Sequence, residues 1–366
     1  MGIKLREHLI NFKKLTYVKE EEKNFGDYVD CALGTNPFGY PTTVNQIMDK
    51  FDFSLINKYP DYPYKELKKA LIRYWSEVAD LKDTNFKIGN GSMDLIERIN
   101  KMFIDKNSKV LGYCPQFPDY VGDVLCCNGI YEYVYLKMEN NYKFTENHLL
   151  SALNRDYTLI YIDNPNNPTG QVIPISVIKD IVEAARELDV CVVVDEAYGD
   201  FMEKDNSAIT LVNKFDNLMV IRSFSKGFGL AGIRVGYLVT GDLLSDYFSK
   251  VEEPFGVNCF GYYAAILALK DDKFINECKN NIKVLKQRIM NACTKLHILE
   301  TDMQTPIMTL MHPNSDLNLY REFFKHNILT EAGEDFIGLG KNFIRLRIPK
   351  DITKLIDAIE TIEKNN

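Results

Sequence analysis

The sequence predicts an α/β fold, with a mainly parallel sheet in a large domain and a smaller α+β domain. Short apolar runs alternate with helical patterns between about residues 85 and 240, which is typical of βαβ units. The chain has 366 residues, and because a single hydrophobic core stops growing at about 250 to 300 residues, we expect a second unit. Polar segments rich in proline and glycine follow four of the apolar runs, as expected where parallel strands end at a ligand site.

Five apolar segments are expected to form strands of the large sheet: residues 109–114, 158–163, 190–195, 218–224 and 234–239. Apolar residues at three- and four-residue spacing predict helices over residues 94–103 and 175–188. Beyond about residue 255 the pattern changes to that of a smaller unit. There it predicts a long helical stretch over 259–296, strand-like segments at 305–312 and 342–348, and a last helix near 351–364.

We therefore expect three parts. Residues 1–30 are predicted to form an N-terminal arm, with a short amphipathic helix followed by the charged run KEEEKN at residues 19–24. Residues 31–255 are expected to form the large α/β domain, and residues 256–366 the small α+β domain. We expect the arm to pack near the small domain.

Composition and charge disfavour several classes of partner. The formal net charge is −7, from 44 basic and 51 acidic residues, and basic residues never form a long run, so neither nucleic acid nor an anionic membrane is an expected partner. The charged N-terminus lacks the apolar core of a signal peptide, and no window reaches the roughly 18 apolar residues of a membrane span. We therefore expect a cytoplasmic protein.

Cysteines and histidines show neither a disulfide pattern nor a metal pattern. The eight cysteines lack C-x-x-C spacing and several lie in apolar segments such as VCVVVD, so we expect reduced, buried thiols. The five histidines are scattered, without the paired spacing of metal ligands. No metal site is expected.

The predicted strand ends carry an unusual set of polar side chains. Asp195 closes the apolar run VCVVV, where an unpaired carboxylate would be costly to bury, so it needs a cation or a hydrogen-bond donor beside it. Tyr198 can bring a phenol to the same place. Asn166 and Asn167 lie between two prolines, which can hold a side-chain amide rigidly at the sheet edge. Each feature alone has a structural alternative, namely a capping or salt-bridged aspartate and a simple turn.

Lys226 lies in the segment SFSKGFGLAGIRVGY, among small residues, two serines and an arginine. A lysine that forms a Schiff base must lose its proton, and a nearby cation with few polar competitors favours that loss. Ser223, Ser225 and Arg234 supply hydroxyls and a guanidinium, which suit a phosphate monoester. The segment therefore combines a reactive amine with a candidate phosphate site.

The segment GNGSMD, residues 89–94, adds a glycine-rich turn that opens a helix, where backbone N–H groups favour a phosphate. The alternative is a simple helix cap by Ser92. Together the strand ends offer a lysine, an aspartate, a phenol with an amide, and a candidate phosphate-binding site. These groups suit the carbonyl carbon, pyridinium nitrogen, ring hydroxyl and phosphate of pyridoxal 5'-phosphate, which we predict as the cofactor.

The segments NPNNPTG, DEAYGDF and SFSKGFGLAGIRVGY, in this order, resemble those of the fold-type I pyridoxal-phosphate aminotransferases of class I and II. The sequence is most similar to the branch of histidinol-phosphate aminotransferase and its relative threonine-phosphate decarboxylase. The similarity covers most of the chain, and its further segments are LGTNPFG (33–39), KYPDYPYKELKKAL (58–71), GNGSMDLIERI (89–99) and NFIRLRI (342–348).

The resemblance implies a catalytic set of Lys226, Asp195 and Tyr198. Lys226 would bind the cofactor as a Schiff base and shuttle the proton of amino transfer. Asp195 would keep the pyridine nitrogen protonated, while Tyr198 and Asn167 would bind the ring hydroxyl. Phe117, in PQFPDY, stands where the family stacks an aromatic ring on the cofactor; a core phenylalanine is the alternative.

The resemblance also implies how the phosphate is bound and that the sites are shared between subunits. Hydroxyls, a guanidinium and backbone groups would hold the cofactor phosphate, at Ser223, Ser225, Arg234, Ser92 and Met93. Tyr59, in KYPD, resembles the tyrosine that reaches the phosphate of the neighbouring subunit. We therefore expect a homodimer with shared active sites.

On the substrate side, Arg345 in FIRLRI aligns with the arginine that binds the substrate α-carboxylate, a bidentate task suited to a guanidinium. Arg347 is its competitor, because strand alternation sends both side chains to the same face. Asn36 and Asn167 are the other residues expected to contact the substrate. The partners implied are an amino acid and a small carbonyl substrate.

The sequence departs from the family at Glu331. Histidinol-phosphate aminotransferases usually carry a second arginine at about this position, where it helps to bind the substrate phosphate or the distal carboxylate of glutamate. A negative charge there would repel a phosphate unless another base compensates it. In addition, TNPFG and the spacing in DFIGLGKNFIRL look closer to the threonine-phosphate decarboxylase branch.

Three functions follow as hypotheses. The first is an aminotransferase that moves an amino group between an amino acid, with glutamate as the expected donor, and a small carbonyl compound with or without a phosphate. The second is a decarboxylase of phosphoserine or phosphothreonine, which differs in the Cα bond that lies perpendicular to the cofactor ring. The third, a non-catalytic binding protein of the same fold, is disfavoured by the retained Lys226, Asp195 and Arg234.

Overall fold

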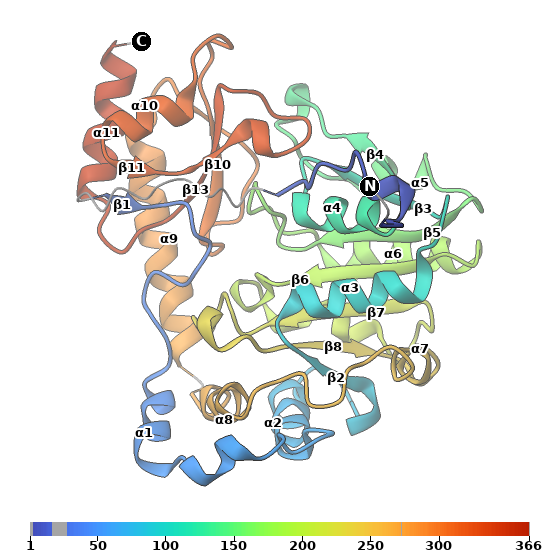
Figure 1. Cartoon of the computed structure of the whole chain (residues 1–366). Coiled ribbons are helices and arrows are strands. Elements are labelled where there is room, and N and C mark those ends of the chain that lie inside the picture. Colours follow the sequence, from blue (N-terminus) through green and yellow to red (C-terminus); the bar gives the residue numbers. More distant parts are fainter. Residues whose placement is uncertain (1–2, 17–27, 272, 366) are drawn as a thin grey trace.

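The protein consists of a large α/β unit and a smaller C-terminal unit, shown in the computed structural model of Figure 1. The structure describes residues 3–16, 28–271 and 273–365. The charged run predicted at residues 19–24 lies outside the described residues.

The large unit is built on a seven-stranded sheet with the order β2-β8-β7-β6-β5-β3-β4. Its strands are β2 Phe86–Gly89, β3 Lys109–Cys114, β4 Ile130–Tyr135, β5 Tyr157–Asp163, β6 Cys191–Glu196, β7 Leu218–Ser223 and β8 Gly236–Thr240. Strands β7, β6, β5, β3 and β4 are parallel to one another, and β8 runs antiparallel to β7 and β2. The mainly parallel sheet is confirmed, and each of the five predicted strands lies within two residues of its predicted ends.

Helices cover both faces of this sheet, as a buried parallel sheet requires. One face is covered by α3 Ser92–Phe103, α4 Pro118–Cys126 and α7 Asp242–Phe248. The other is covered by α2 Lys65–Trp75, α5 Glu146–Leu150, α6 Ile175–Arg186 and α8 Cys259–Ala268. Side-chain alternation along β6 serves both layers, because Val193 packs with the first set of helices and Val192 and Val194 with the second. The two helices predicted by periodicity are confirmed as α3 and α6.

The C-terminal unit contains a four-stranded antiparallel sheet in the order β12-β13-β10-β9. Its strands are β9 His297–Ile298, β10 Ile307–Met311, β12 Glu331–Ala332 and β13 Phe343–Arg347. Its helices are α9 Phe274–Ala292, α10 Leu319–Lys325 and α11 Thr353–Asn365. The two strands and the last helix predicted for this region are confirmed. The short strand β1 Val29–Asp30 joins this unit by pairing in parallel with β11 Ile328–Leu329.

The helical stretch predicted over 259–296 is two helices rather than one. α8 ends at Ala268 and α9 begins at Phe274, whose N–H donates a 3.0 Å hydrogen bond to the Asp271 carboxylate. Aspartate favours helix starts because its oxygens accept from free backbone N–H groups. α8 packs into the core of the large unit, whereas α9 contributes to the core of the C-terminal unit.

The N-terminal arm differs from its prediction in two ways. Between residues 3 and 16 it contains a 3-10 turn, Glu7–Leu9, instead of an amphipathic α-helix. Its residues 3–16 pack on α4 of the large unit, where His8 Nε2 lies 3.0 Å from the Cys126 carbonyl oxygen, whereas its last residues, in β1, reach the small domain as predicted. Gly122 permits this packing, because a Cβ there would lie 2.6 Å from the Leu15 carbonyl oxygen.

The division into residues 31–255 and 256–366 stays a proposal about folding units. The hydrophobic cluster of the large unit includes Tyr262 and Ala265 of α8, and Cys31 packs in the cluster of the C-terminal unit. The region between β1 and α2 includes the short helix α1 Ile47–Lys50.

None of the helices in the described part of the chain has the length and apolar character that a membrane span needs.

Candidate active site

The register of the large sheet aligns the polar strand ends along one edge. Asp163, the last residue of β5, pairs with Asp195 near the end of β6. Ser223 at the end of β7 pairs with Gly236 at the start of β8, which also pairs with Gly89 at the end of β2. Because β8 is antiparallel, the segment that precedes it reaches this same edge. The predicted location of the site at the carboxyl ends of the strands therefore has a structural basis.

Lys226 and Tyr198 lie together at this edge. Lys226 Nζ is 5.3 Å from the centre of the Tyr198 ring, and the Tyr198 hydroxyl donates to the Gly34 carbonyl oxygen over 3.4 Å. A Cβ on Gly34 would lie 1.9 Å from the Tyr198 hydroxyl and 3.3 Å from Lys226 Nζ. The LGTNPFG segment therefore forms one wall of the site, and only glycine allows this close approach.

Asp195 is buried and held by two donors. The Tyr161 hydroxyl donates to Asp195 Oδ2 over 2.8 Å, and the Ala197 N–H donates to Oδ1 over 2.9 Å. Burial raises the pKa of Asp195, and the two hydrogen bonds and the charge of Lys226 oppose that rise. Asp195 therefore has the cation and donors that the sequence required for a carboxylate in an apolar strand.

Tyr161 was missed by sequence reasoning. Its ring stacks on the Tyr120 ring of α4, with centroids 3.5 Å apart and an interplanar angle of 8°. The signal was present in β5, where Tyr161 precedes Asp163 by two residues on the same face. Recognising its partner required the register between β5 and β6, which places Tyr161 beside Val193 and so diagonal to Asp195.

A second buried carboxylate, Asp163, holds the loop that carries Asn167. Its oxygens accept from the Asn167 N–H at 2.9 Å, the Tyr113 hydroxyl at 2.8 Å and the Asn166 amide at 3.1 Å. Burial raises the pKa of Asp163 to about 6, against the lowering effect of these donors. The NPNNPTG segment is thus more than a simple turn, because it is hydrogen-bonded at the sheet edge.

The serines and arginine of SFSKGFGLAGIR form a cup beside the start of α3. Arg234 Nη1 donates to Ser225 Oγ over 3.4 Å, and the Ser225 N–H donates to Ser223 Oγ over 3.1 Å. A Cβ on Gly91 would lie 2.5 Å from Arg234 Nη2. Arg234 itself has φ 56°, a left-handed conformation that is unusual for a residue with a side chain and is found at ligand sites.

The N-terminus of α3 points into this same cup. The alternative that Ser92 caps the helix is wrong, because Gly91 occupies the capping position with φ 84° and offers no side-chain acceptor. Ser92 and Met93 are instead the first two helical residues, whose backbone N–H groups have no carbonyl partner within the helix.

The two candidate carboxylate arginines lie on one buried face, as strand alternation predicted, but have different partners. Arg345 is fully buried and donates through Nη1 to Asn167 Oδ1 over 3.3 Å and through Nη2 to the Ala32 carbonyl. Arg347 donates to the Asp30 carbonyl and lies 3.5 Å from the Asp30 carboxylate. Both oppose the rise that burial causes in the pKa of Tyr198. Of the two, Arg345 makes the direct contact with the Asn167 loop.

Glu331 lies directly opposite Arg345 in the ladder between β12 and β13. Its Oε1 is 3.3 Å from Arg345 Nη2. The residue at which the sequence departs from the family is therefore the buried ionic partner of the predicted substrate arginine. Sequence reasoning identified the position but not this contact.

Three other predicted residues have contrasting surroundings. Asn36 donates to the Gly227 carbonyl over 2.7 Å and accepts from the Phe38 N–H over 2.9 Å, so its amide holds the wall of the site to the residue after Lys226. Phe117 caps the start of α4 and packs, partly buried, on the cluster under α3 and α4. Tyr59 is 81% exposed, and its ring centre lies 4.8 Å from that of Phe255.

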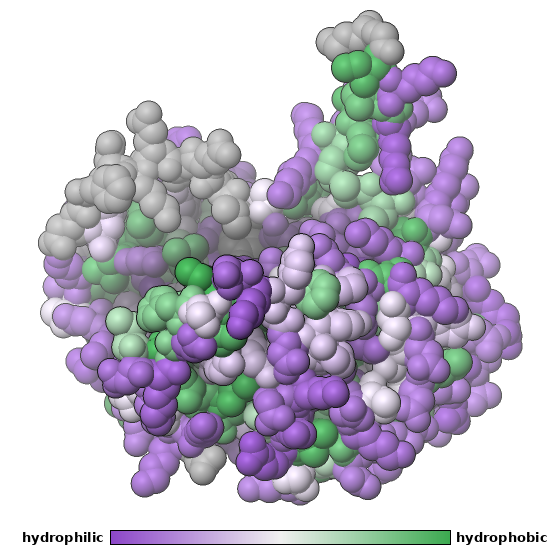
Figure 2. Space-filling model, turned by 60° about the horizontal axis from the view of Figure 1, so that its bottom comes forward, coloured by the Kyte–Doolittle hydropathy of each residue, from purple (hydrophilic) through white to green (hydrophobic). Residues whose placement is uncertain are grey.

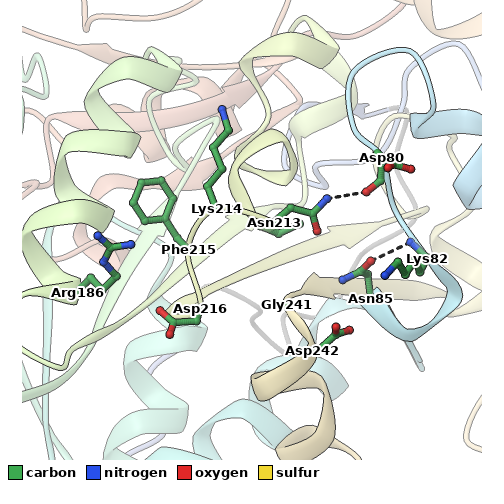
Figure 3. A pocket seen from close by; sticks show the side chains of 11 residues that line it. Asp80, Lys82, Asn85, Arg186, Asn213, Lys214, Phe215, Asp216, Gly241 and Asp242 are labelled. Atoms are coloured by element: carbon green, nitrogen blue, oxygen red, sulfur yellow. Dashed lines mark hydrogen bonds between the residues drawn. The ribbon is translucent and has the colours of Figure 1, made fainter.

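A separate pocket of about 680 Å³ lies at the opposite end of β7, as shown in Figure 3. It is lined by side chains of both charges, and two hydrogen bonds lie within it: the Asn213 amide donates to the Asp80 carbonyl, and the Lys82 N–H donates to the Asn85 side chain. None of the predicted site residues lines it. In the part of the chain that the structure describes, no group of three or more His, Cys, Asp or Glu side chains could hold a metal ion.

Comparison with known proteins agrees with this geometry. The family described as aminotransferase class I and II matches residues 27–359. The chain is 30% identical over 326 residues to histidinol-phosphate aminotransferase of Clostridium novyi, and this alignment covers 88% of each chain. The solved histidinol-phosphate aminotransferase of Clostridium acetobutylicum superposes with a TM-score of 0.83 at 25% identity, covering 92% of this chain and 100% of that one.

The structure of histidinol-phosphate aminotransferase from Sinorhizobium meliloti, solved in complex with pyridoxal-5'-phosphate, has the same fold, with a TM-score of 0.81 at 23% identity, covering 92% of this chain and 91% of that one. Together these matches agree with the seven-stranded sheet and with the motifs at its edge. The chain therefore belongs to the class I and II aminotransferase family and is a fold-type I, pyridoxal-phosphate-dependent aminotransferase of the histidinol-phosphate aminotransferase branch.

Proposed function

We propose that the enzyme transfers an amino group between an α-amino acid and a small carbonyl compound at the sheet edge that carries Lys226. The observation that carries this proposal is the position of Lys226 Nζ, 5.3 Å from the Tyr198 ring in a site that also contains the buried Asp195. An amine, a phenol and a carboxylate in this arrangement can move the protons that amino transfer requires. The family relationship supports the same reaction.

The residues at this edge fit pyridoxal 5'-phosphate. Ser223, Ser225 and Arg234 offer two hydroxyls and a guanidinium, and Gly91 leaves room beside Arg234 where a side chain would collide. The N–H groups of Ser92 and Met93 at the start of α3 add a favourable site for a phosphate. When bound, the cofactor supplies a protonated pyridine ring that withdraws electrons from the substrate Cα.

We assign the proton chemistry to three side chains. Lys226 would bind the cofactor carbonyl carbon and carry the proton between the substrate Cα and the cofactor. The Asp195 carboxylate would hold the pyridine nitrogen protonated, since Tyr161 and Ala197 donate to it and favour its ionised form. Tyr198 and Asn167 would donate to the ring hydroxyl, with Phe117 against the ring face.

We propose Arg345 rather than Arg347 as the ligand of the substrate α-carboxylate. Its contact with Asn167 supports this assignment, because it ties the guanidinium to the loop at the cofactor edge. Arg347 is engaged with the carbonyl and the carboxylate of Asp30 in β1, and no hydrogen bond joins it to Asn167 in the described part of the chain. Asn36 would act on the substrate indirectly, by holding the wall of the site to Gly227.

We further propose a homodimer with shared active sites. Large hydrophobic side chains are exposed around the segment that carries Tyr59, at Met48, Phe53, Ile56, Tyr62, Phe255, Phe260 and Tyr263. Hydrophobic residues are visible among the hydrophilic ones on the face brought forward in Figure 2, which lies at the bottom of Figure 1 where α1, α2 and α8 are found. Exposed apolar groups of this extent favour burial against a partner.

We also propose that the protein is located in the cytoplasm, since all eight cysteines are free thiols.

The reaction is tested by adding single amino donors to the purified holoenzyme and following the visible absorption of the bound cofactor. Glutamate, other amino acids and histidinol phosphate form the panel, the last because relatives carry that name. If the enzyme is an aminotransferase, an amino donor removes the visible absorption band of the bound cofactor and is released as the matching carbonyl product. Carbon dioxide is measured separately, because its release from phosphoserine or phosphothreonine without a carbonyl product would support the decarboxylase instead.

The cofactor link is tested with Lys226→Ala and, as control, the exposed Lys250→Ala. Borohydride reduction is expected to attach the cofactor covalently to the wild type and to the control variant but not to Lys226→Ala. Covalent attachment in Lys226→Ala would overturn the assignment.

A further inference from the structure

The contact between Glu331 and Arg345 changes the charge of the proposed substrate site. Arg345 is fully buried, and Glu331 is 9% exposed. Their side chains face each other across adjacent antiparallel strands, with Oε1 3.3 Å from Nη2. A buried carboxylate at this distance neutralises the arginine before any substrate arrives.

The surrounding charges do not restore a positive site. Arg347 has its own carboxylate partner, Asp30, at 3.5 Å. Burial is the main cause of the raised pKa of the Tyr198 phenol; the charges of Arg345 and Arg347 oppose this rise and the charge of Glu331 adds to it, so all three charges act on Tyr198. The four groups Arg345, Arg347, Glu331 and Asp30 therefore sum to zero formal charge.

The electrostatic free energy of substrate binding at this site therefore depends on how many negative charges the substrate carries. One α-carboxylate on Arg345 gives this group of residues a net charge of −1. A second carboxylate or a phosphate adds further negative charge in a partly buried place, where repulsion is poorly screened. A neutral side chain adds nothing, and an ammonium, guanidinium or imidazolium returns the site to neutrality.

We propose that Glu331 is a specificity-determining residue that selects amino substrates with an uncharged or positively charged side chain and disfavours phosphate monoesters and dicarboxylates. This inference rests on the proposed function, since it takes Arg345 as the ligand of the substrate carboxylate. Glu331 needs no part in proton transfer, and its effect is the electrostatic cost that it adds to each further anionic group.

The test compares pairs of equal shape and different charge on the holoenzyme. Unreactive glutarate and its monoamide, glutaramate, are titrated by calorimetry, and glutamate and glutamine are compared in the single-donor reaction. The wild type is expected to prefer the amide member of each pair by about tenfold, a conservative size for one like-charge contact at an effective dielectric constant of about 20. Lysine serves as the positively charged amino donor, and we expect it to react faster than glutamate in the single-donor reaction.

The matched variants are Glu331→Gln, which removes the charge at constant shape, and Glu331→Arg, which reverses it. Glu331→Gln should remove the tenfold preference, and Glu331→Arg should invert it in favour of the dicarboxylate. The control is Glu334→Gln, an exposed carboxylate three residues further along, which should keep the wild-type ratio.

Four results are informative. A wild type that binds glutarate more tightly than glutaramate overturns the inference, even if a variant fails to fold. The inference is also overturned if Glu331→Gln weakens the binding of glutarate and glutaramate equally and leaves the ratio of their affinities unchanged. That outcome indicates that Glu331 only positions Arg345. A preserved charge preference in calorimetry without reaction of any donor contradicts the proposed function but not the charge selection. A preference that Glu331→Gln removes supports the inference.

Discussion

The Tyr161 hydroxyl donates a 2.8 Å hydrogen bond to Asp195 Oδ2 while the Tyr161 ring stacks on Tyr120 at 3.5 Å. The stacking fixes the ring, so the hydroxyl meets the carboxylate without further ordering. Because this bond opposes the rise that burial causes in the pKa of Asp195, it favours the ionised carboxylate that the proposed cofactor contact needs. Tyr161 is thus a positioning residue that acts through Asp195.

Replacing Tyr161 with phenylalanine tests this relationship. The ring and its stacking remain, but Asp195 loses a donor, and a hydrogen bond to a charged group contributes about 1.5 to 3 kcal/mol. We expect the dissociation constant of pyridoxal phosphate to rise at least about tenfold, measured by titrating the cofactor into apoenzyme. Tyr157→Phe is the control, since its hydroxyl binds Glu132 from the other end of the same strand. Equal affinity in both variants would contradict the role of Tyr161.

Gly34→Ala should slow the reaction strongly without unfolding the enzyme. The new Cβ would lie 1.9 Å from the Tyr198 hydroxyl, so the phenol must move, and displacements of about 1 Å at a reacting group can lower the rate about a hundredfold. We expect kcat to fall by about that factor, with little change in the melting temperature. Gly232→Ala is the control, because a Cβ there meets no atom within 4 Å. Normal turnover in Gly34→Ala would show that the Tyr198 position is not critical.

Lys286 is expected to contribute strongly to stability. Its buried ammonium, with three N–H groups, lies within hydrogen-bonding distance of four oxygens in the segment before and within β10: Thr301 Oγ1 at 2.7 Å and the carbonyls of Asp302 at 2.6 Å, Thr305 at 3.1 Å and Ile307 at 2.9 Å. Lys286→Met leaves these acceptors without their donor and should lower the free energy of unfolding by about 3 kcal/mol. Denaturant unfolding measures the change, and the exposed Lys283→Met on the same helix should cost far less.

Asp163 predicts a pH dependence of stability. Its pKa in the folded protein is raised to about 6, above the value of about 3.9 of an unperturbed aspartate. Between about pH 4 and 6 the folded state therefore binds more protons at this group than the unfolded state. Its contribution to the free energy of unfolding is present below about pH 4 and is lost as the pH rises through 6.

Asp163→Asn should remove this contribution, because an amide does not ionise. We expect a flatter curve of unfolding free energy against pH between about 4 and 6, measured by urea denaturation at several pH values. The exposed Asp156→Asn, just before the same strand, should keep the wild-type slope. An unchanged slope in Asp163→Asn would show that this carboxylate stays ionised throughout that range.

Much of the fold could be predicted because it is encoded locally. Five strands of the large sheet and the helices α3 and α6 follow from apolar runs and helical periodicity, which depend on neighbours within one element. The edge strands β2 and β4 were not predicted. The arm and the division of residues 259–296 were predicted less well. Those outcomes depend on contacts with distant segments, such as the fit of Leu15 beside Gly122.

The sequence by itself determined the chemistry that is available, because the polar residues after each apolar run, among them Lys226, Asp195 and Arg234, are identified by type and position. Tertiary structure decided which of these residues meet. Tyr161 is 34 residues from Asp195, and Arg345 is 178 residues from Asn167. The physical reason is that strand register is set by packing between elements, and no local pattern specifies that Glu331 lies opposite Arg345.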